Sequence, residues 1–289
     1  MIVRLRVAGL TLRAKAKGTL PGLRLPARLD AFSARRGADI ALEVREEAAP
    51  PALPGARLFD SGGLWSVHRH GPGRRLYVFQ EPASGRPPLK ALLIDEGLRR
   101  GVLYVPRARQ SGKPGYALGF PLDEVLFQHR LTAEGGLFVH ACAVRIGGGA
   151  ALFCGVSGAG KTTLGRLFHR AGYTVLSDDR VGLHGEGGRL RAFGTPWHGS
   201  GRFGSPLAAP LRAVFFLKQA KVSEALPLAG GGSRLFSLSF PPLWDEVGVA
   251  RTLEACGAVA SRVPLFELRF RKDSTAVSAV REALASLPS

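Results

Sequence analysis

One glycine-rich stretch, Gly155–Thr162, constrains the fold of this 289-residue chain more than any other feature. It reads G-x-x-x-x-G-K-T, with the apolar run Ala150–Cys154 before it and Leu164–Phe168 after it. Glycines let backbone N–H groups converge on phosphate oxygens without a Cβ in the way, and the following helix points its positive end at the same place. Because these flanks are the context that the phosphate-loop motif requires, the stretch predicts a strand, a phosphate-binding turn and a helix.

The turn predicts ATP and Mg²⁺ as cofactors. Lys161 is expected to reach the β- and γ-phosphates as a point charge, and the Thr162 hydroxyl is expected to bind Mg²⁺. The alternative is a glycine-rich turn that binds nothing, which the complete motif with correct flanks disfavours. The residues expected to contact the nucleotide are Gly155, Val156, Ser157, Gly158, Ala159, Gly160, Lys161, Thr162 and Thr163.

Two adjacent carboxylates, Asp178 and Asp179, follow the predicted strand Tyr173–Ser177. Open α/β sheets bind their ligands at the carboxyl ends of the strands. One carboxylate suffices to assist Mg²⁺, which leaves the second free to accept a proton from an incoming hydroxyl. The alternative is that one aspartate caps a turn while the other holds the metal. His140 lies in the predicted strand Leu137–Ile146, and by itself a lone histidine among apolar residues is more often a core group.

The order of these motifs resembles the catalytic core of the HPr kinase/phosphorylase family. A strand histidine (His140), the phosphate loop and the run Asp178-Asp179-Arg180-Val181 appear with the family's spacing, over roughly residues 120–220. The resemblance implies a protein serine kinase whose fold is related to phosphoenolpyruvate carboxykinase. It further implies that Asp179 is the general base, that Asp178 belongs to the metal and hydrogen-bond network, and that His140 lies close to both.

One segment departs from the family pattern. The family's L-E-x-R-G-x-G segment, which supplies a second metal-binding glutamate, is replaced here by Gly194–Gly199. This is similar to a divergent branch of HPr-kinase-related proteins that includes enzymes phosphorylating ribosomally made peptides. The branch suggests Thr195 and His198 as site-lining residues, with Trp197 equally suited to packing, and it leaves Arg202 and Arg234 as guesses for the family's C-terminal arginine.

The pattern of strands and helices predicts an α/β chain of two domains. Residues 1–115 alternate with period two in short segments separated by Gly/Pro turns, which predicts a small β-rich domain of unknown role. The predicted boundary is the run Ser111–Gly115, and residues 116–289 form the predicted kinase domain.

The formal net charge of +18 attracts polyanions such as nucleic acid, an acidic peptide or an anionic membrane. The basic residues are scattered and no aromatic–basic interleaving is present, so an arginine-rich but merely solvated surface is favoured over nucleic-acid binding. No signal peptide and no membrane-spanning run are evident in the sequence, and we expect a cytoplasmic protein. A homo-oligomer stays open.

The leading hypothesis is therefore a phosphotransferase that moves the γ-phosphoryl group of ATP to a hydroxyl, most readily a serine of a peptide or small protein, with Asp179, Asp178, His140 and Lys161 as catalytic residues and Thr162 and Asp178 as metal ligands. A sugar or amino-acid kinase would use the same residues. The non-enzymatic alternative is a nucleotide-gated binding module.

Overall fold

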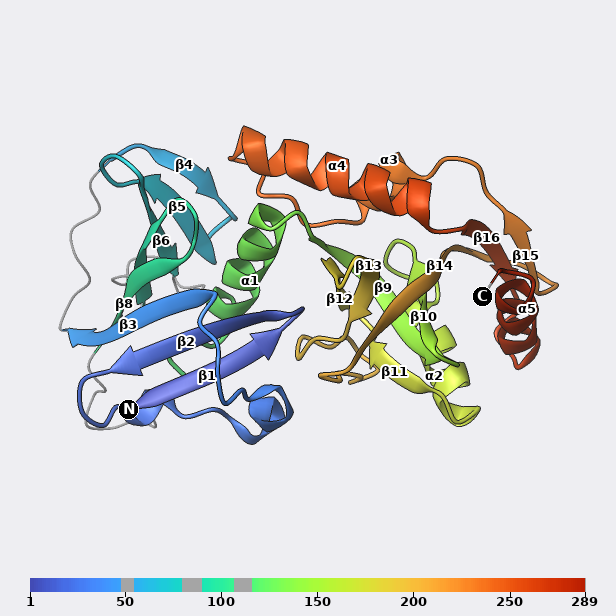
Figure 1. The fold of residues 1–289 in the computed structure, drawn as a ribbon, viewed down its shortest axis with the longest axis horizontal. Helices are drawn as coiled ribbons and strands as arrows, with labels where there is room; N and C mark the ends of the chain where they lie inside the picture. Colours follow the sequence, from blue (N-terminus) through green and yellow to red (C-terminus); the bar gives the residue numbers. More distant parts are fainter. Residues whose placement is uncertain (48–54, 80–89, 107–115, 289) are drawn as a thin grey trace. The chain divides into compact units, whose positions relative to one another are not determined.

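The computed structural model describes residues 1–47, 55–79, 90–106 and 116–288. They form two compact units, the first comprising Met1–Arg6, Leu10–Arg130 and Leu243–Asp245 and the second comprising Val7–Gly9, Leu131–Pro242 and Glu246–Ser289. Each unit has its own β-sheet, with most of the helices in the second (Figure 1), which confirms the mixed α/β class. The predicted boundary at Ser111–Gly115 lies outside the described residues.

The first unit is built on an eight-stranded sheet in the order β1-β2-β3-β8-β7-β6-β5-β4. Along Ile40–Val44 buried side chains alternate with more exposed ones, because successive residues of a strand point to opposite faces. The first two strands are joined by a tight turn in which Ala8 and Gly9 both have positive φ, at 52° and 83°. The strands are β1 (Ile2–Val7), β2 (Leu10–Ala16), β3 (Ile40–Glu47), β4 (Arg57–Asp60), β5 (Trp65–Arg69), β6 (Arg74–Phe79), β7 (Lys90–Asp95) and β8 (Arg100–Pro106), and α1 (Leu122–Ala133) follows.

The second unit is organised around two long strands, β9 (Leu137–Ile146) and β14 (Ala208–Gln219). The first part of each joins the antiparallel pair β12 (Arg180–Glu186) and β13 (Arg189–Phe193), and the second part of each flanks β10 (Gly149–Cys154). β11 (Thr174–Ser177) pairs with β9, while β16 (Leu265–Phe270) pairs with β14 and β15 (Glu224–Pro227). The helices are α2 (Lys161–Arg170), α3 (Gly232–Ser237), α4 (Glu246–Arg262) and α5 (Thr275–Ala285).

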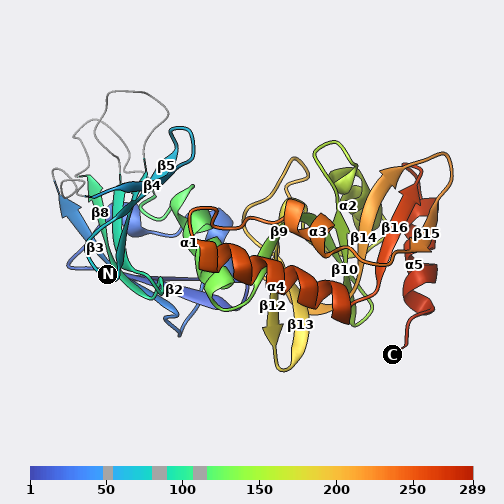
Figure 2. The same ribbon diagram turned by 90° about the horizontal axis from the view of Figure 1, so that it is seen from above.

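Helices cover both faces of the β10-centred strands (Figure 2). Alternate residues of β10 pack into two separate cores: Ala150, Leu152 and Cys154 join α3 and α4, whereas Ala151 and Phe153 join α2 and α5. Strands buried on both faces read as continuous apolar runs, which is why Ala150–Cys154 predicts a strand from its sequence. In β9 the same alternation places Cys142 and Val144 on the α2 side.

The strand predicted over Leu137–Ile146 is confirmed as β9, and the predicted strand and helix on either side of the glycine-rich turn are confirmed as β10 and α2. Three details differ. The glycine-rich run Gly230–Ser233 predicts a loop, but the short helix α3 begins at Gly232 and buries Leu235 completely. The spacing of apolar residues over Pro241–Ala260 predicts a helix, but α4 begins only at Glu246. Asp273 is the cap that the sequence predicts for the last helix, whereas the N-cap of α5 is Ser274, although Asp273 Oδ1 accepts a hydrogen bond from the Thr275 N–H at 3.0 Å.

Candidate functional site

The carboxyl ends of three parallel strands converge on the glycine-rich turn. β14 runs parallel to both β10 and β16, so all three end at one edge. The turn leaves β10 directly after Cys154, and Gln219 at the end of β14 donates a hydrogen bond from Nε2 to Gly158 O at 2.8 Å. Phe270 at the end of β16 lies against Gly160. This is the edge at which α/β proteins bind ligands.

The turn needs its glycines and suits a phosphate group. Gly158 and Gly160 have φ values of 80° and 108°, which residues other than glycine rarely adopt. A Cβ on Gly160 would also lie 2.6 Å from Phe270 Cζ. α2 begins without a side-chain cap or an acidic residue in its first turn, so its first N–H groups, which have no acceptor inside the helix, are available to an anion. Val156, Ser157 and Gly158 are exposed at the tip of the turn.

Lys161 folds back over the turn that precedes it. Its Nζ donates to Gly155 O at 2.6 Å and to Val156 O at 3.0 Å. Burial lowers the pKa of the Lys161 ammonium, and the charge of the nearby Asp179 carboxylate opposes that shift. The predicted phosphate ligand and the predicted base are thus close enough to influence each other electrostatically.

Asp178 is buried, with 2% of its surface exposed, and its carboxylate connects two segments of the chain. Its Oδ1 accepts a hydrogen bond from Gly199 N at 2.9 Å, and its Oδ2 accepts one from Gly201 N at 2.7 Å. The Thr162 hydroxyl also donates to Oδ2, at 3.5 Å. Asp178 therefore joins the start of α2 to the loop around Gly199, and the two predicted metal ligands, Thr162 and Asp178, lie side by side.

Asp179 is held by two donors. His140 Nδ1 lies 2.8 Å from Oδ1, and Arg180 Nη1 lies 2.7 Å from Oδ2. Burial favours the protonated acid, but the hydrogen bond from His140 and the charges of Arg180 and Lys161 outweigh it and lower the pKa of Asp179. The carboxylate is one quarter exposed, so an ionised oxygen acceptor is presented to solvent.

The strand register creates this arrangement. β12 pairs with β9 so that Arg180 lies opposite His140, and Ala141 N donates to Asp179 O at 3.1 Å. Period two places His140 on the same face of β9 as Cys142, the face that packs against α2. His140 therefore lies beside Asp179, with 28% of its side chain exposed, and is not enclosed in the core.

The residues of the divergent Gly194–Gly199 segment have mixed positions. Thr195 is fully buried and its hydroxyl donates to Arg180 O at 2.6 Å, so it braces the strand that carries the site. Trp197 packs edge-on against Phe138, with ring centroids 5.7 Å apart. His198 is exposed. Of the two guessed arginines, Arg202 is exposed, and Arg234 lies over the ring of Phe216 at 5.6 Å.

Sequence reasoning missed three contributors to the site. Gly199 and Gly201 hold Asp178 through their N–H groups, and a Cβ on Gly201 would lie 2.5 Å from Asp178 Oδ2. Phe240 lies under the guanidinium of Arg180, with 4.4 Å between Cζ and the ring centroid. The glycines stand in a conspicuous G-S-G run, whereas no motif in the sequence points to Phe240.

The donor set fits a nucleotide better than a metal bound by the protein alone. Across the described ranges, three or more His, Cys, Asp or Glu side chains nowhere gather as a metal site would require. A Mg²⁺ ion at a phosphate loop needs few protein ligands, since phosphate oxygens and waters complete its shell. Thr162 and Asp178 supply one hydroxyl and one carboxylate, which is sufficient for that arrangement.

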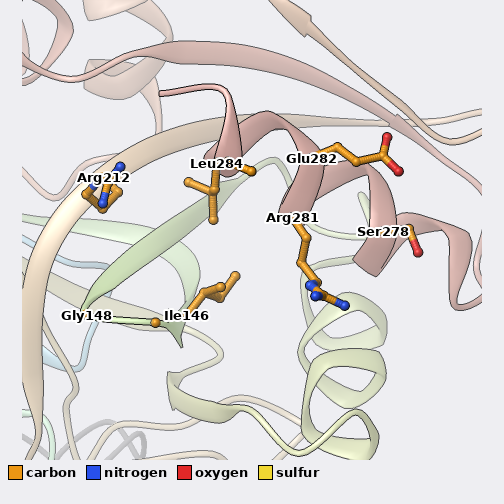
Figure 3. Close-up of a pocket in the computed structure, with 9 residues that line it drawn as sticks. Ile146, Gly148, Arg212, Ser278, Arg281, Glu282 and Leu284 are labelled. Atoms are coloured by element: carbon orange, nitrogen blue, oxygen red, sulfur yellow. The ribbon is translucent and has the colours of Figure 1, made fainter. Parts of the chain in front are cut away.

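A pocket of about 520 Å³ lies elsewhere in the second unit (Figure 3). It is lined by Gly147 and Gly148, which precede β10, by Arg212, and by residues of α5 that include Arg281. Since the glycine-rich turn leaves the other end of β10, this pocket is separate from the predicted nucleotide site. No helix in the described part of the chain has the length and apolar character needed to cross a bilayer.

Comparison with known proteins finds similar solved structures but no match by sequence. No family model matches the sequence, and no curated protein matches it. Among solved structures, the HPr(Ser) kinase/phosphatase from Coxiella burnetii aligns over 51% of this chain and 92% of its own, with 12% sequence identity and a TM-score of 0.30. At this level of similarity the activity in that protein's name describes that protein alone.

Proposed function

We propose that this chain is an ATP- and Mg²⁺-dependent kinase that transfers the γ-phosphoryl group to a hydroxyl. The acceptor we favour is a serine of a peptide or small protein. One observation carries the proposal: the start of α2, directly after the glycine-rich turn, lies beside the aspartate pair, with Thr162 Oγ1 3.5 Å from Asp178 Oδ2 and with Asp179 held by His140 and Arg180. A structural turn would need neither the uncapped helix start nor the exposed carboxylate.

In the proposed reaction the protein mainly positions the two substrates and neutralises the charge of the phosphates. The backbone N–H groups of the turn and Lys161 hold the β- and γ-phosphates, for which Lys161 exchanges its contacts with the carbonyls of Gly155 and Val156. The acceptor oxygen forms a bond to the γ-phosphorus while the bond to the β–γ bridging oxygen breaks, and ADP leaves. The acceptor proton passes to Asp179, whose two oxygens retain lone pairs beside those used by His140 and Arg180.

The lowered pKa of Asp179 fits this role. A carboxylate that stays ionised orients the acceptor hydroxyl throughout the approach and takes its proton late, which suits a loose phosphoryl-transfer transition state. Bound Mg²⁺ supplies neutralisation of the phosphate charge, and Thr162 and Asp178 are the residues that would hold it. Asp178 also fixes the loop at Gly199 and Gly201, so it joins metal binding to the shape of the site.

The serine acceptor rests on the resemblance in motif order described above. A sugar or amino-acid kinase would use the same phosphate loop and the same base, and a nucleotide-gated module would bind ATP without transfer. The deciding assay incubates the protein with γ-labelled ATP and Mg²⁺ together with serine-containing peptides, free sugars and free amino acids. Label on a peptide serine supports the proposal, label on a small molecule redirects it to a metabolite kinase, and ATP binding without transfer contradicts it.

Two variants separate chemistry from binding. Asp179→Asn is expected to lower transfer by about 10²–10⁴-fold while leaving ATP affinity near that of the wild type, because Asp179 acts on the acceptor. Lys161→Ala is expected to weaken ATP binding by roughly tenfold or more, because a charge-assisted contact to phosphate is lost. Their matched controls are Glu186→Gln, at the far end of the strand that begins at Arg180, and the exposed Lys272→Ala. Transfer at wild-type rate by Asp179→Asn would remove the proposed base.

A further inference from the structure

The segment Leu238–Phe240 occupies a special place in the second unit. β10 pairs with β9 up to the partners Cys154 and Ala141, after which the chain turns away as the glycine-rich turn. Beyond that point Leu238–Phe240 takes the vacated edge of β9, with Val139 bridged to Ser239. His140 N donates to Leu238 O at 2.7 Å, and Phe240 N donates to Phe138 O at 3.3 Å. The backbone of Phe240 is therefore fixed beside the strand that carries His140.

The ring of Phe240 contacts both groups that hold Asp179. The Arg180 guanidinium carbon lies 4.4 Å from the ring centroid, which is a cation–π distance. The ring also meets the His140 imidazole edge-on, with centroids 6.5 Å apart. Arg180 side-chain atoms are 22% exposed, so the guanidinium borders solvent, and the Phe240 ring packs against it while it is paired with Asp179.

We propose that Phe240 is a positioning residue for phosphoryl transfer, which it supports by holding Arg180 and His140 against Asp179. The inference rests on the proposed function for its kinetic consequence, but the placement of Arg180 stands independently of it. The ring contacts that carry the proposal are with Arg180 and His140, which hold Asp179, so we expect the effect of Phe240 on the transfer step and not on ATP binding.

The kinetic test compares Phe240→Leu, which keeps apolar volume, with Phe240→Tyr, which keeps the ring. Phe240→Leu is expected to lower kcat by roughly three- to thirtyfold with KM for ATP unchanged, the range that a partly desolvated cation–π contact can supply. Phe240→Tyr is expected to have a kcat near the wild-type value. The matched control is Phe236→Leu, which changes a partly buried ring of α3 that packs against the core of the second unit. Equal losses of kcat in Phe240→Leu and Phe236→Leu would overturn the proposal.

A double-mutant cycle tests whether Phe240 acts through Arg180. Arg180→Lys keeps the charge but loses the planar group that stacks on the ring. Once Arg180→Lys is present, Phe240→Leu is expected to have less than a twofold further effect on kcat, since both changes remove the same interaction. Full multiplication of the two losses would contradict action through Arg180.

A measurement that needs no activity separates this inference from the proposed function. In the NMR spectrum of the wild type the Arg180 guanidinium protons, assigned by their loss in Arg180→Lys, are expected to be shifted by the Phe240 ring current. In Phe240→Leu they are expected to move to the position of a free arginine, and in Phe236→Leu they are expected to stay. An unchanged Arg180 signal in Phe240→Leu would refute the positioning role. Absence of transfer to every acceptor, with the ring-shifted signal intact, would instead count against the kinase function alone.

Discussion

Replacing Gly201 by alanine tests the packing on which the site depends. The new Cβ would lie 2.5 Å from Asp178 Oδ2, 2.8 Å from Phe203 Cδ2 and 2.9 Å from Thr162 Cγ2. Real Cβ contacts are essentially never this short, so either the loop withdraws or the carboxylate moves. Withdrawal breaks the bond from Gly201 N to Asp178 Oδ2, and movement of the carboxylate strains the bond from Gly199 N.

The expected loss follows from these contacts. Overpacking a close-fitting site costs about 1–3 kcal/mol, and a hydrogen bond to a charged group contributes a similar amount. The two are alternatives here, because relaxing one contact breaks the other. Gly201→Ala is therefore expected to lower the free energy of unfolding by about 1–3 kcal/mol.

The assay is urea denaturation followed by circular dichroism, with Gly185→Ala as the matched control. A Cβ on Gly185, an exposed position in β12, meets no atom within 4 Å. That variant is expected to stay within about 0.5 kcal/mol of the wild type. Because Thr162 is one of the displaced neighbours, Gly201→Ala should also weaken Mg²⁺·ATP binding, measurable by titration with a labelled nucleotide. If Gly201→Ala unfolds at the same urea concentration as Gly185→Ala, the close packing of Gly201 against the Asp178 carboxylate does not contribute to stability as proposed.

Two further predictions concern pH. Burial lowers the pKa of His129 in the first unit to about 3. As the pH falls below about 6.5, the histidine takes up a proton in the unfolded chain but stays neutral in the folded chain, so the folded state loses stability. The loss is about 1.4 kcal/mol per pH unit, or about 2 kcal/mol at pH 5. The unfolding free energy of the wild type should fall more steeply between pH 7.5 and 5 than that of His129→Phe, and parallel slopes would contradict the burial argument. In the site, the charge of Arg180 helps to keep the pKa of Asp179 below its ordinary value, so the acid limb of the pH–rate profile should move to higher pH in Arg180→Gln. An unmoved limb would show that Arg180 does not set the ionisation of the base.

Local sequence was sufficient to predict the strand and the helix on either side of the glycine-rich turn. The apolar run of β10, the G-x-x-x-x-G-K-T stretch and the helix after it depend on contacts between near neighbours in the chain, and the structure has them as predicted. The positive φ values at Gly158 and Gly160 belong to this local class, since only glycine adopts them without strain. Most strands of the first unit were predictable for the same reason, because alternation is visible within a single strand, whereas β4 and β8 were not predicted.

The sequence could not decide which residues surround the aspartate pair. His140 reads as a core histidine until the register of β9 and β12 sets it opposite Arg180, 40 positions later in the chain. Phe240 carries no signal of its own, and it reaches Arg180 only because Leu238–Phe240 fills the edge that β10 leaves. Asp178 is predicted as a metal ligand, yet its two bonds to Gly199 and Gly201 come from a loop whose path no short-range pattern encodes.

The chain by itself determined the strand, the glycine-rich turn and the helix on which the proposed phosphate site is built, because a turn of this kind is specified by backbone conformations that individual residues permit or forbid. Tertiary structure alone decided how those carboxylates are held, because strand register and loop closure bring together groups that are distant in sequence. The ionisation and direction of Asp179 depend on those distant groups, so they became visible only with the fold.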